Sequence, residues 1–287
     1  MIGDFLGMMS LSCLFSCEFR QKAVLSPKKH QLMIIRIGND TIAILSQHNV
    51  ENRAGYACID MRGGMSASAN LREAFLSHPL LKTNDDKVVV LVDAPTMMVP
   101  LEEFSEQDKD IIFDHTCSGH EQDLKMHFVM EKLHAVALFA LERDIKTVID
   151  DHFSQAQFIP VSAPLWLQAV KQAEGVRQRL YAFFHDGKTD VVCIYRRRFK
   201  FANTFSASYA HDALYYILSA FSYLGFKTER DEVVMLGATP HKPWLTNNIQ
   251  TYVGHAAFDD GEAIGLTDDG TAYLPIDIRA TLNTILS

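Results

Sequence analysis

The sequence lacks an apolar run long enough to cross a membrane. A spanning helix needs about 20 mostly apolar residues, whereas the apolar stretch near the start, Phe5 to Phe15, is short. No basic residue precedes this stretch, and Asp4 lies directly before it. Because a secretory signal begins with a positively charged region, we expect neither a signal peptide nor a membrane span.

Cysteine is scarce and does not come in pairs. The five cysteines are scattered and odd in number: Cys13, Cys17, Cys58, Cys117 and Cys193. A small secreted domain stabilised by disulfides usually has an even number of cysteines. We therefore expect free thiols in a reducing compartment, and hence a cytoplasmic protein.

The chain also lacks the excess of positive charge that a nucleic-acid site requires. Its 27 Lys and Arg residues are outnumbered by 35 Asp and Glu residues, which gives a net charge of −8. The stretch Arg196 to Phe201 mixes cations with aromatic residues, but Phe199 alternates with Arg198 and Lys200. That period of two is typical of a half-buried strand whose cations face water. We expect no nucleic-acid partner.

Motifs of common enzyme classes are absent. The sequence contains no Gly-x-Ser-x-Gly, no His-Glu-x-x-His and no Walker loop. No motif of these enzyme classes therefore supports a function as a hydrolase or transferase. His115, Cys117, His120 and His127 are residue types that bind zinc, but their spacings match no standard zinc site. We interpret them as solvated loop residues, and we predict no metal site and no catalytic residues.

One supersecondary pattern is present twice. The first copy reads HQLMIIRIGNDTIAIL, GYACIDMR, SASANLREAFLSH and KVVVLVDAPT. The second reads RLYAFFHDGKTDVVCIY, RFKFANTF, SYAHDALYYILSAFSYLG and DEVVMLGATP. Each copy predicts strand, tight turn, strand, strand, helix and strand. Because repeated units bury their apolar faces against each other, we expect two similar halves with a cleft between them.

Short local signals predict several helix ends. Ser66 or Ser68 is suited to cap the helix of the first copy, and Ser162 starts a later helix. Ser208 is the expected cap of the longest helix. Gly225 is expected to end that helix in a left-handed conformation.

The fold class predicted from this pattern is α/β, with two lobes at residues 30–176 and 177–287. The segment after Pro95 has no counterpart in the second half, so we predict a small subdomain inserted in the first lobe at about residues 95–141. Residues 1–29 precede the first strand. We expect them to form a disordered or loosely packed extension.

This duplicated pattern with an insertion resembles the actin-like ATPase superfamily, whose lobes have the ribonuclease H-like fold. The insertion lies after VVVLVDAPTMMVPLEEF and before ALFALERDIKTVIDDHF. Its position is similar to that in the bacterial branch of cell-division and pilus-assembly actin-like proteins. The chain also resembles an uncharacterised Bacteroidetes family with an actin-like fold. The resemblance covers most of residues 30–287 and rests on the order of the elements.

In that superfamily two hairpins bind the phosphates of ATP, and an acid in each holds the Mg²⁺ shell or the attacking water. The Asp-x-Gly of the first hairpin corresponds here to Arg36-x-Gly38, which puts a cation where a metal-facing carboxylate is expected. In the second hairpin Asp186 lies in the turn itself, and the usual acid position is aromatic. The glycine pair on the adenosine side corresponds to Gly237 followed by an alanine.

Because the sign of the charge is inverted where Mg²⁺ would sit, we predict a non-catalytic scaffold or adaptor that binds a protein partner and no cofactor. The alternative is a nucleotide-binding switch or slow ATPase, in which ATP and Mg²⁺ bind in the cleft and close the lobes. In that case the cofactor-binding residues would be Gly38, Thr41, Gly187, Thr189 and Gly237.

Overall fold

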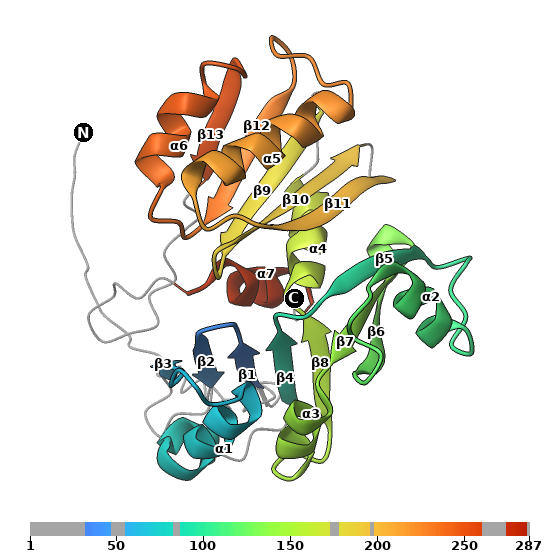
Figure 1. Cartoon of the computed structure of the whole chain (residues 1–287), viewed down its shortest axis with the longest axis vertical. Coiled ribbons are helices and arrows are strands. Elements are labelled where there is room, and N and C mark those ends of the chain that lie inside the picture. Colours follow the sequence, from blue (N-terminus) through green and yellow to red (C-terminus); the bar gives the residue numbers. More distant parts are fainter. Residues whose placement is uncertain are drawn as a thin grey trace, which may run out of the picture.

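The computed structural model describes residues 32–46, 55–82, 87–172, 178–195, 198–259 and 274–285 (Figure 1). The predicted extension at residues 1–29 and the expected lobe boundary near residue 176 lie outside these ranges. The described part of the chain contains two sheets of five strands and one of three. None of its helices combines the length and apolar character that crossing a bilayer requires.

The first sheet and its two helices come from the N-terminal half of the chain. The elements are β1 (Leu32–Ile37), β2 (Thr41–Ser46), β3 (Gly55–Asp60), α1 (Ala67–Ser77), the 3-10 helix η1 (Pro79–Lys82), β4 (Lys87–Val92), α3 (Arg143–Asp150) and β8 (Ala156–Pro160). The strand order is β3-β2-β1-β4-β8, with β1 antiparallel to β2 and parallel to β4. One face is covered by α1 and α3, where Leu71 and Ile149 share an apolar cluster with Ile35 of β1. These elements form the first lobe.

The second sheet repeats this arrangement. Its elements are β9 (Arg179–His185), β10 (Lys188–Tyr195), β11 (Arg198–Ser206), α5 (Ala210–Tyr223), β12 (Glu232–Gly237), α6 (Lys242–Ile249) and β13 (His255–Asp259). The strand order is β11-β10-β9-β12-β13, with β9 antiparallel to β10 and parallel to β12. The predicted duplication is therefore confirmed, and these elements form the second lobe.

The segment inserted after β4 forms a small antiparallel sheet of order β5-β7-β6. Its elements are β5 (Thr96–Pro100), α2 (Lys109–Thr116), β6 (Leu124–Met130), the 3-10 helix η2 (Glu131–Leu133) and β7 (Ala135–Leu141). Phe113 of α2 is fully buried in a cluster with Leu138 of β7. A subdomain with its own small core is therefore present where the sequence predicts an insertion.

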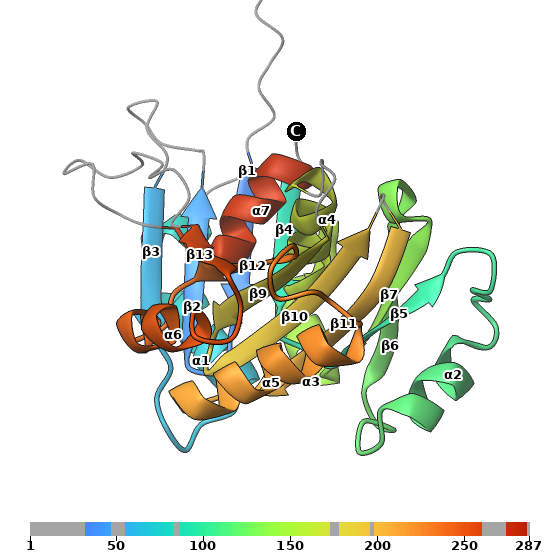
Figure 2. The same ribbon diagram turned by 90° about the horizontal axis from the view of Figure 1, so that it is seen from above.

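Two helices, α4 (Ser162–Gln172) and α7 (Ile276–Thr284), lie between the two larger sheets and pack against each other (Figure 1, Figure 2). Trp166 of α4 and Ile278 of α7 belong to one apolar cluster with Ile34 of β1 and Phe183 of β9. This cluster, which we call the interlobe core, runs from the first sheet to the second. It sets the distance between the faces on which the charged residues described below lie.

Local capping signals locate some helix ends and miss one. Ser66 caps α1, because its hydroxyl accepts the N–H of Ala69 at 3.2 Å. Gly225 follows α5 with a φ of +70°, as predicted. The prediction that Ser208 caps α5 is wrong, because the N-cap is the next residue, Tyr209, whose side chain makes no capping bond.

Gly237 at the end of β12 is required by the fold itself. Its φ is +94°, and a Cβ there would lie 2.3 Å from the carbonyl oxygen of Phe184.

We expect Gly237→Ala to lower the free energy of unfolding by about 2 kcal/mol or more, because the strain of a left-handed backbone adds to a clash with the backbone of Phe184. Gly63→Ala is the matched control, since nothing lies within 4 Å of a Cβ at that position. Urea unfolding measures both variants, and equal losses would contradict this assignment.

Candidate functional site

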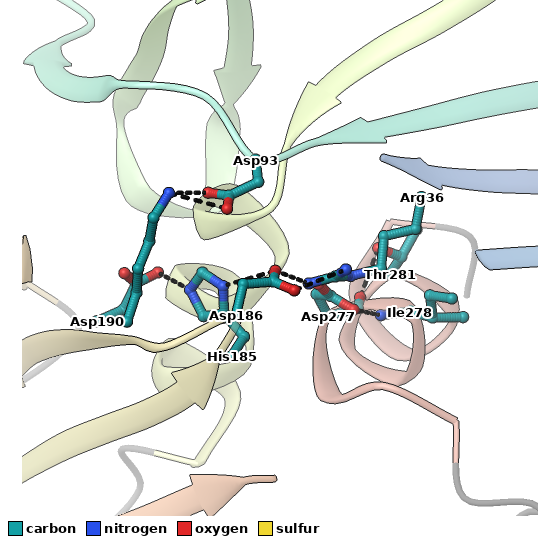
Figure 3. A network of polar contacts seen from close by, with 9 residues as sticks. Arg36, Asp93, His185, Asp186, Asp190, Asp277, Ile278 and Thr281 are labelled. Carbon is teal, nitrogen blue, oxygen red and sulfur yellow. Dashed lines mark hydrogen bonds and ion pairs between the residues drawn. The ribbon is translucent and has the colours of Figure 1, made fainter. Parts of the chain in front are cut away.

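The candidate site lies where the apolar faces of the two larger sheets end in charged residues. Side chains of a strand alternate between its two faces, and Ile34 of β1 and Phe183 of β9 belong to the interlobe core. Two positions further along the same faces are Arg36 and His185, both buried. Charges from both sheets therefore enter the same space between the lobes (Figure 3).

Strand β10 extends this charged end on the second sheet. Val192 and Ile194 lie in the interlobe core, and alternation puts Asp190 and Lys188 on the same face, nearer the turn to β9. Asp190 is only 1% exposed. A carboxylate so deeply buried needs a nearby positive charge, which the neighbouring His185 supplies.

Arg36 is the centre of the site and contacts two distant segments of the chain. Its Nε donates a hydrogen bond to Oδ2 of Asp277 at 2.5 Å, and its Nη2 donates one to Oδ2 of Asp186 (Figure 3). Burial alone would lower the pKa of this guanidinium, but the two carboxylates outweigh burial and raise the pKa above its ordinary value. Arg36 is therefore charged and joins β1 to the β9–β10 turn and to α7.

His185 lies between two carboxylates and is protonated at neutral pH. Its Nδ1 is 3.4 Å from Oδ2 of Asp186, and its Nε2 is 3.3 Å from Oδ2 of Asp190. The contact with Asp190 is an ion pair without hydrogen-bond geometry, so the oxygens of Asp190 are buried without a hydrogen-bond donor. Burial alone would lower the pKa of His185, but the two carboxylates raise it to about 10.

Asp186 shares its carboxylate between the two cations. It forms a two-residue turn with Gly187, and both have positive φ values, +45° and +68°, which is the pattern of a type I′ hairpin. Burial alone would raise the pKa of the Asp186 carboxyl, but hydrogen bonds with His185 and Arg36 hold this pKa well below its ordinary value. Asp186 is therefore ionised at any physiological pH.

A second ion pair crosses between the lobes beside the first. Nζ of Lys188 in β10 is 2.8 Å from both carboxylate oxygens of Asp93, which follows β4 of the first sheet. The N–H of Asp93 donates to the carbonyl of Ile37 at 3.0 Å, which holds Asp93 at the end of β1. The site thus contains three cations, Arg36, His185 and Lys188, and four carboxylates, Asp93, Asp186, Asp190 and Asp277.

Three of these residues are close enough together to share a metal ion. Donor atoms of Asp93, His185 and Asp186 lie within 4.8 Å of one another. However, Lys188 already holds Asp93, Arg36 already holds Asp186, and His185 is protonated. Mg²⁺ requires free oxygen ligands, and the neighbouring guanidinium repels it. The residues present therefore do not fit the Mg²⁺ that the resemblance to actin-like ATPases implies.

A cavity of about 680 Å³ lies next to these charges, a size in the usual range for small-molecule sites. Arg36, His185 and Asp277 form part of its wall, and Lys242 at the start of α6 forms another part. Of the residues predicted to bind nucleotide, Thr41 and Gly237 also line this cavity.

The other three residues predicted to bind nucleotide are not part of the cavity wall. A Cβ on Gly38 would be 2.5 Å from Nη1 of Arg36, so this glycine makes room for the ion pair. Gly187 lies in the β9–β10 turn. Thr189 is fully buried on the opposite face of β10, the face that packs on α5, and its hydroxyl has no hydrogen-bond partner. Nucleotide binding by the five residues stays a prediction.

Several residues of the site were missed by reasoning from the sequence. Asp277 is 241 positions from Arg36, and no motif links the two. Asp93 and Lys188 come from different halves of the chain in the same way. One signal was available: Arg36 is the single charge in the buried strand LMIIRI. A charge in such a strand requires a buried partner, but the sequence does not say which acid provides it.

The four potential zinc ligands do not come together. Nδ1 of His120 is 2.8 Å from Asp123, and Nδ1 of His127 is 3.0 Å from Glu106. His115 and Cys117 belong to no group of metal-ligating residues among the described parts of the chain. The pairing of His120 and His127 with separate carboxylates argues against a shared zinc ion.

Comparison with known proteins identifies the family. A family model described as "Protein of unknown function (DUF3822)" matches residues 21–256. The chain belongs to this family. No curated protein matches the sequence.

Two of the solved structures that are similar to this DUF3822 protein illustrate its fold. One is a Bacteroides thetaiotaomicron protein with an actin-like ATPase fold and unknown function, with a TM-score of 0.78, 22% identity, and coverage of 89% of this chain and 96% of that one. The other is a PilM–PilN type IV pilus biogenesis complex, with a TM-score of 0.52, 13% identity, and coverage of 91% and 98%. The predicted actin-like fold class, and the resemblance that led to it, are confirmed.

The protonated state of His185 makes the stability of this DUF3822 protein depend on pH. Its pKa of about 10 lies above the ordinary value of 6.5, so its stabilising effect is fully present below pH 6.5 and is lost as the pH rises to about 10. Over this window we expect the free energy of unfolding to fall by up to about 1.4 kcal/mol per pH unit. Urea unfolding at a series of pH values measures the slope.

Two variants isolate the contribution of His185 from that of other titrating groups. His185→Gln removes the buried imidazole, so we expect a flatter dependence of stability on pH in the same window. His211→Gln removes an exposed imidazole on α5 and is expected to keep the wild-type slope. If His185→Gln also kept that slope, the buried imidazolium would not be its source.

Proposed function

We propose that this protein is a non-catalytic scaffold or adaptor that binds a protein partner. The observation that carries the proposal is the guanidinium of Arg36, which is buried between Asp186 and Asp277. In a phosphoryl-transfer site of this fold class, carboxylates hold the metal that neutralises the phosphates. Here a side chain of the protein itself neutralises two of the carboxylates.

The electrostatic cost of adding a metal supports a loss of catalysis. A Mg²⁺ ion placed beside Asp186 would compete with Arg36 and with the imidazolium of His185, both of which contact that carboxylate. Removing even one preorganised electrostatic contact typically costs about 10²–10³ in rate. Repulsion by a buried cation is a larger defect, because it opposes metal binding itself.

The partner-binding half of the proposal is supported by the fold. One of the similar structures is that of a complex, PilM–PilN, so this architecture is compatible with holding a protein partner. The inserted subdomain gives the first lobe a sheet and a helix that have no counterpart among the described residues of the second lobe. Because the two-lobe fold does not require this subdomain, its surface is available to bind a protein partner.

A nucleotide-binding switch is the second candidate. It is favoured by the cavity of about 680 Å³, because Thr41 and Gly237 are in its wall and Lys242 adds a cation. In this alternative ATP would bind in the cavity and change the relative position of the lobes. A slow ATPase would in addition require Mg²⁺, which the charges around Asp186 oppose.

Isothermal titration with ATP and Mg²⁺, together with a phosphate-release assay, separates these functions. The scaffold proposal predicts no binding heat at millimolar nucleotide and no magnesium-dependent phosphate release. ATP binding that is weakened by Lys242→Met, a change in the cavity wall, would favour the switch instead. Phosphate release that requires Mg²⁺ and is lost in the same variant would contradict a non-catalytic protein. Lys146→Met on α3, outside the cavity, is the control.

A further inference from the structure

The β9–β10 turn is tied to the first lobe on both of its sides. On one side Asp186 pairs with Arg36 of β1, and on the other Lys188 pairs with Asp93 at the end of β4. These two ion pairs have opposite polarity, because the second lobe provides the acid of one and the base of the other. Such an exchange fixes the two hairpin regions relative to each other in position and in orientation.

Helix α7 provides a third anchor. Asp277 is fully buried; its Oδ2 accepts from Nε of Arg36, and its Oδ1 accepts the N–H of Ile278 at 2.7 Å. The carbonyl of Asp277 also accepts the hydroxyl of Thr281 at 2.8 Å. The carboxylate that holds Arg36 is thus itself fixed by the first turn of its helix (Figure 3).

Loss of either member of a buried pair leaves an uncompensated charge, which is strongly destabilising. Arg36, Asp186, Asp277 and Asp93 all have side chains at most 11% exposed. Separation of the lobes at this end would break both ion pairs, Arg36 with Asp186 and Lys188 with Asp93. Closure of a hinged protein is normally stabilised by a ligand that contacts both lobes, whereas here both sets of contacts belong to the chain.

We propose that Arg36, Asp93, Asp186, Lys188 and Asp277 form an interlobe latch that holds the two lobes closed without any ligand. The latch takes the place of nucleotide as the element that joins the lobes, so the cleft does not open and close with nucleotide. The inference goes beyond the scaffold proposal, because a latched pair of lobes has this property whichever partner the protein binds. For a scaffold, the consequence is that its two lobes present a surface of fixed shape.

Distance measurements between the lobes test the latch in the full-length chain. Spin labels are placed at Leu76 on α1 and Tyr223 on α5, which are 78% and 82% exposed, after the native cysteines are replaced in a common background. Double electron–electron resonance then reports the distance between the lobes. We expect one narrow distribution in the parent, unchanged by ATP with Mg²⁺. Arg36→Met combined with Lys188→Met is expected to shift the mean distance by more than about 2 Å and to broaden it.

A matched control removes a Lys–Asp pair that does not cross between the lobes. Lys146→Met eliminates the pair between Lys146 and Asp150 within α3, and we expect it to leave the distribution unchanged. Circular dichroism establishes that each variant is folded. If the double variant does not fold, Lys188→Met alone is measured, because Lys188 is 24% exposed and its loss is milder.

Two results would overturn the latch. The first is a folded Arg36→Met/Lys188→Met variant, or a folded Lys188→Met variant where the double variant fails, with the distance distribution of the parent. The second is a parent whose distribution moves when ATP and Mg²⁺ are added, because the lobes would then respond to nucleotide. The first result leaves the scaffold proposal unaffected, whereas the second would also favour the nucleotide-binding switch. Failure of the latch alone is therefore distinguishable from failure of the scaffold proposal.

Discussion

The relative position of the two lobes depends on one buried guanidinium. Arg36 lies near the end of β1, a strand that is otherwise apolar, and contacts carboxylates of the β9–β10 turn and of α7. Taking these charges out of water is expensive, and the attraction between them repays the cost only when every partner is in place. The contact therefore adds specificity for one arrangement of the lobes more than it adds net stability. Apolar burial is non-directional, whereas a hydrogen-bonded ion pair specifies how the two lobes are positioned relative to each other.

The residues that maintain the fold and the residues of the candidate site lie at different positions along the same strand faces. The interlobe core is apolar along most of β1, β9 and β10, and buried charges follow it where these strands approach the hairpin turns. A change of residue type at those ends leaves the core, the sheet order and the twofold repeat intact. The fold is therefore maintained by residues that have no part in the site, and similarity of fold does not carry the activity with it.

Sequence patterns were sufficient for the architecture because they are local and repeated. Hairpin turns, aliphatic strands and the glycine after α5 each act within a few residues, and each appears in the structure. Ser208 was misplaced because adjacent residues compete for the same capping position. Both faces of β10 are apolar, so alternation alone does not show which face lines the cavity. Thr189 lies on the face that packs on α5, away from the cavity. For ion pairs between residues more than a hundred positions apart, such as Arg36 with Asp186, the local sequence does not indicate which residue is the partner.

A double-mutant cycle between Arg36 and Asp186 tests the central claim most directly. Arg36→Met retains an unbranched apolar stem, and Asp186→Asn retains a residue that tolerates the left-handed turn. Urea unfolding of the parent, both single variants and the double variant gives the coupling free energy between the two side chains. A buried pair that joins the lobes predicts a coupling of about 2 kcal/mol or more. A coupling below about 0.5 kcal/mol, as in exposed ion pairs, would contradict it.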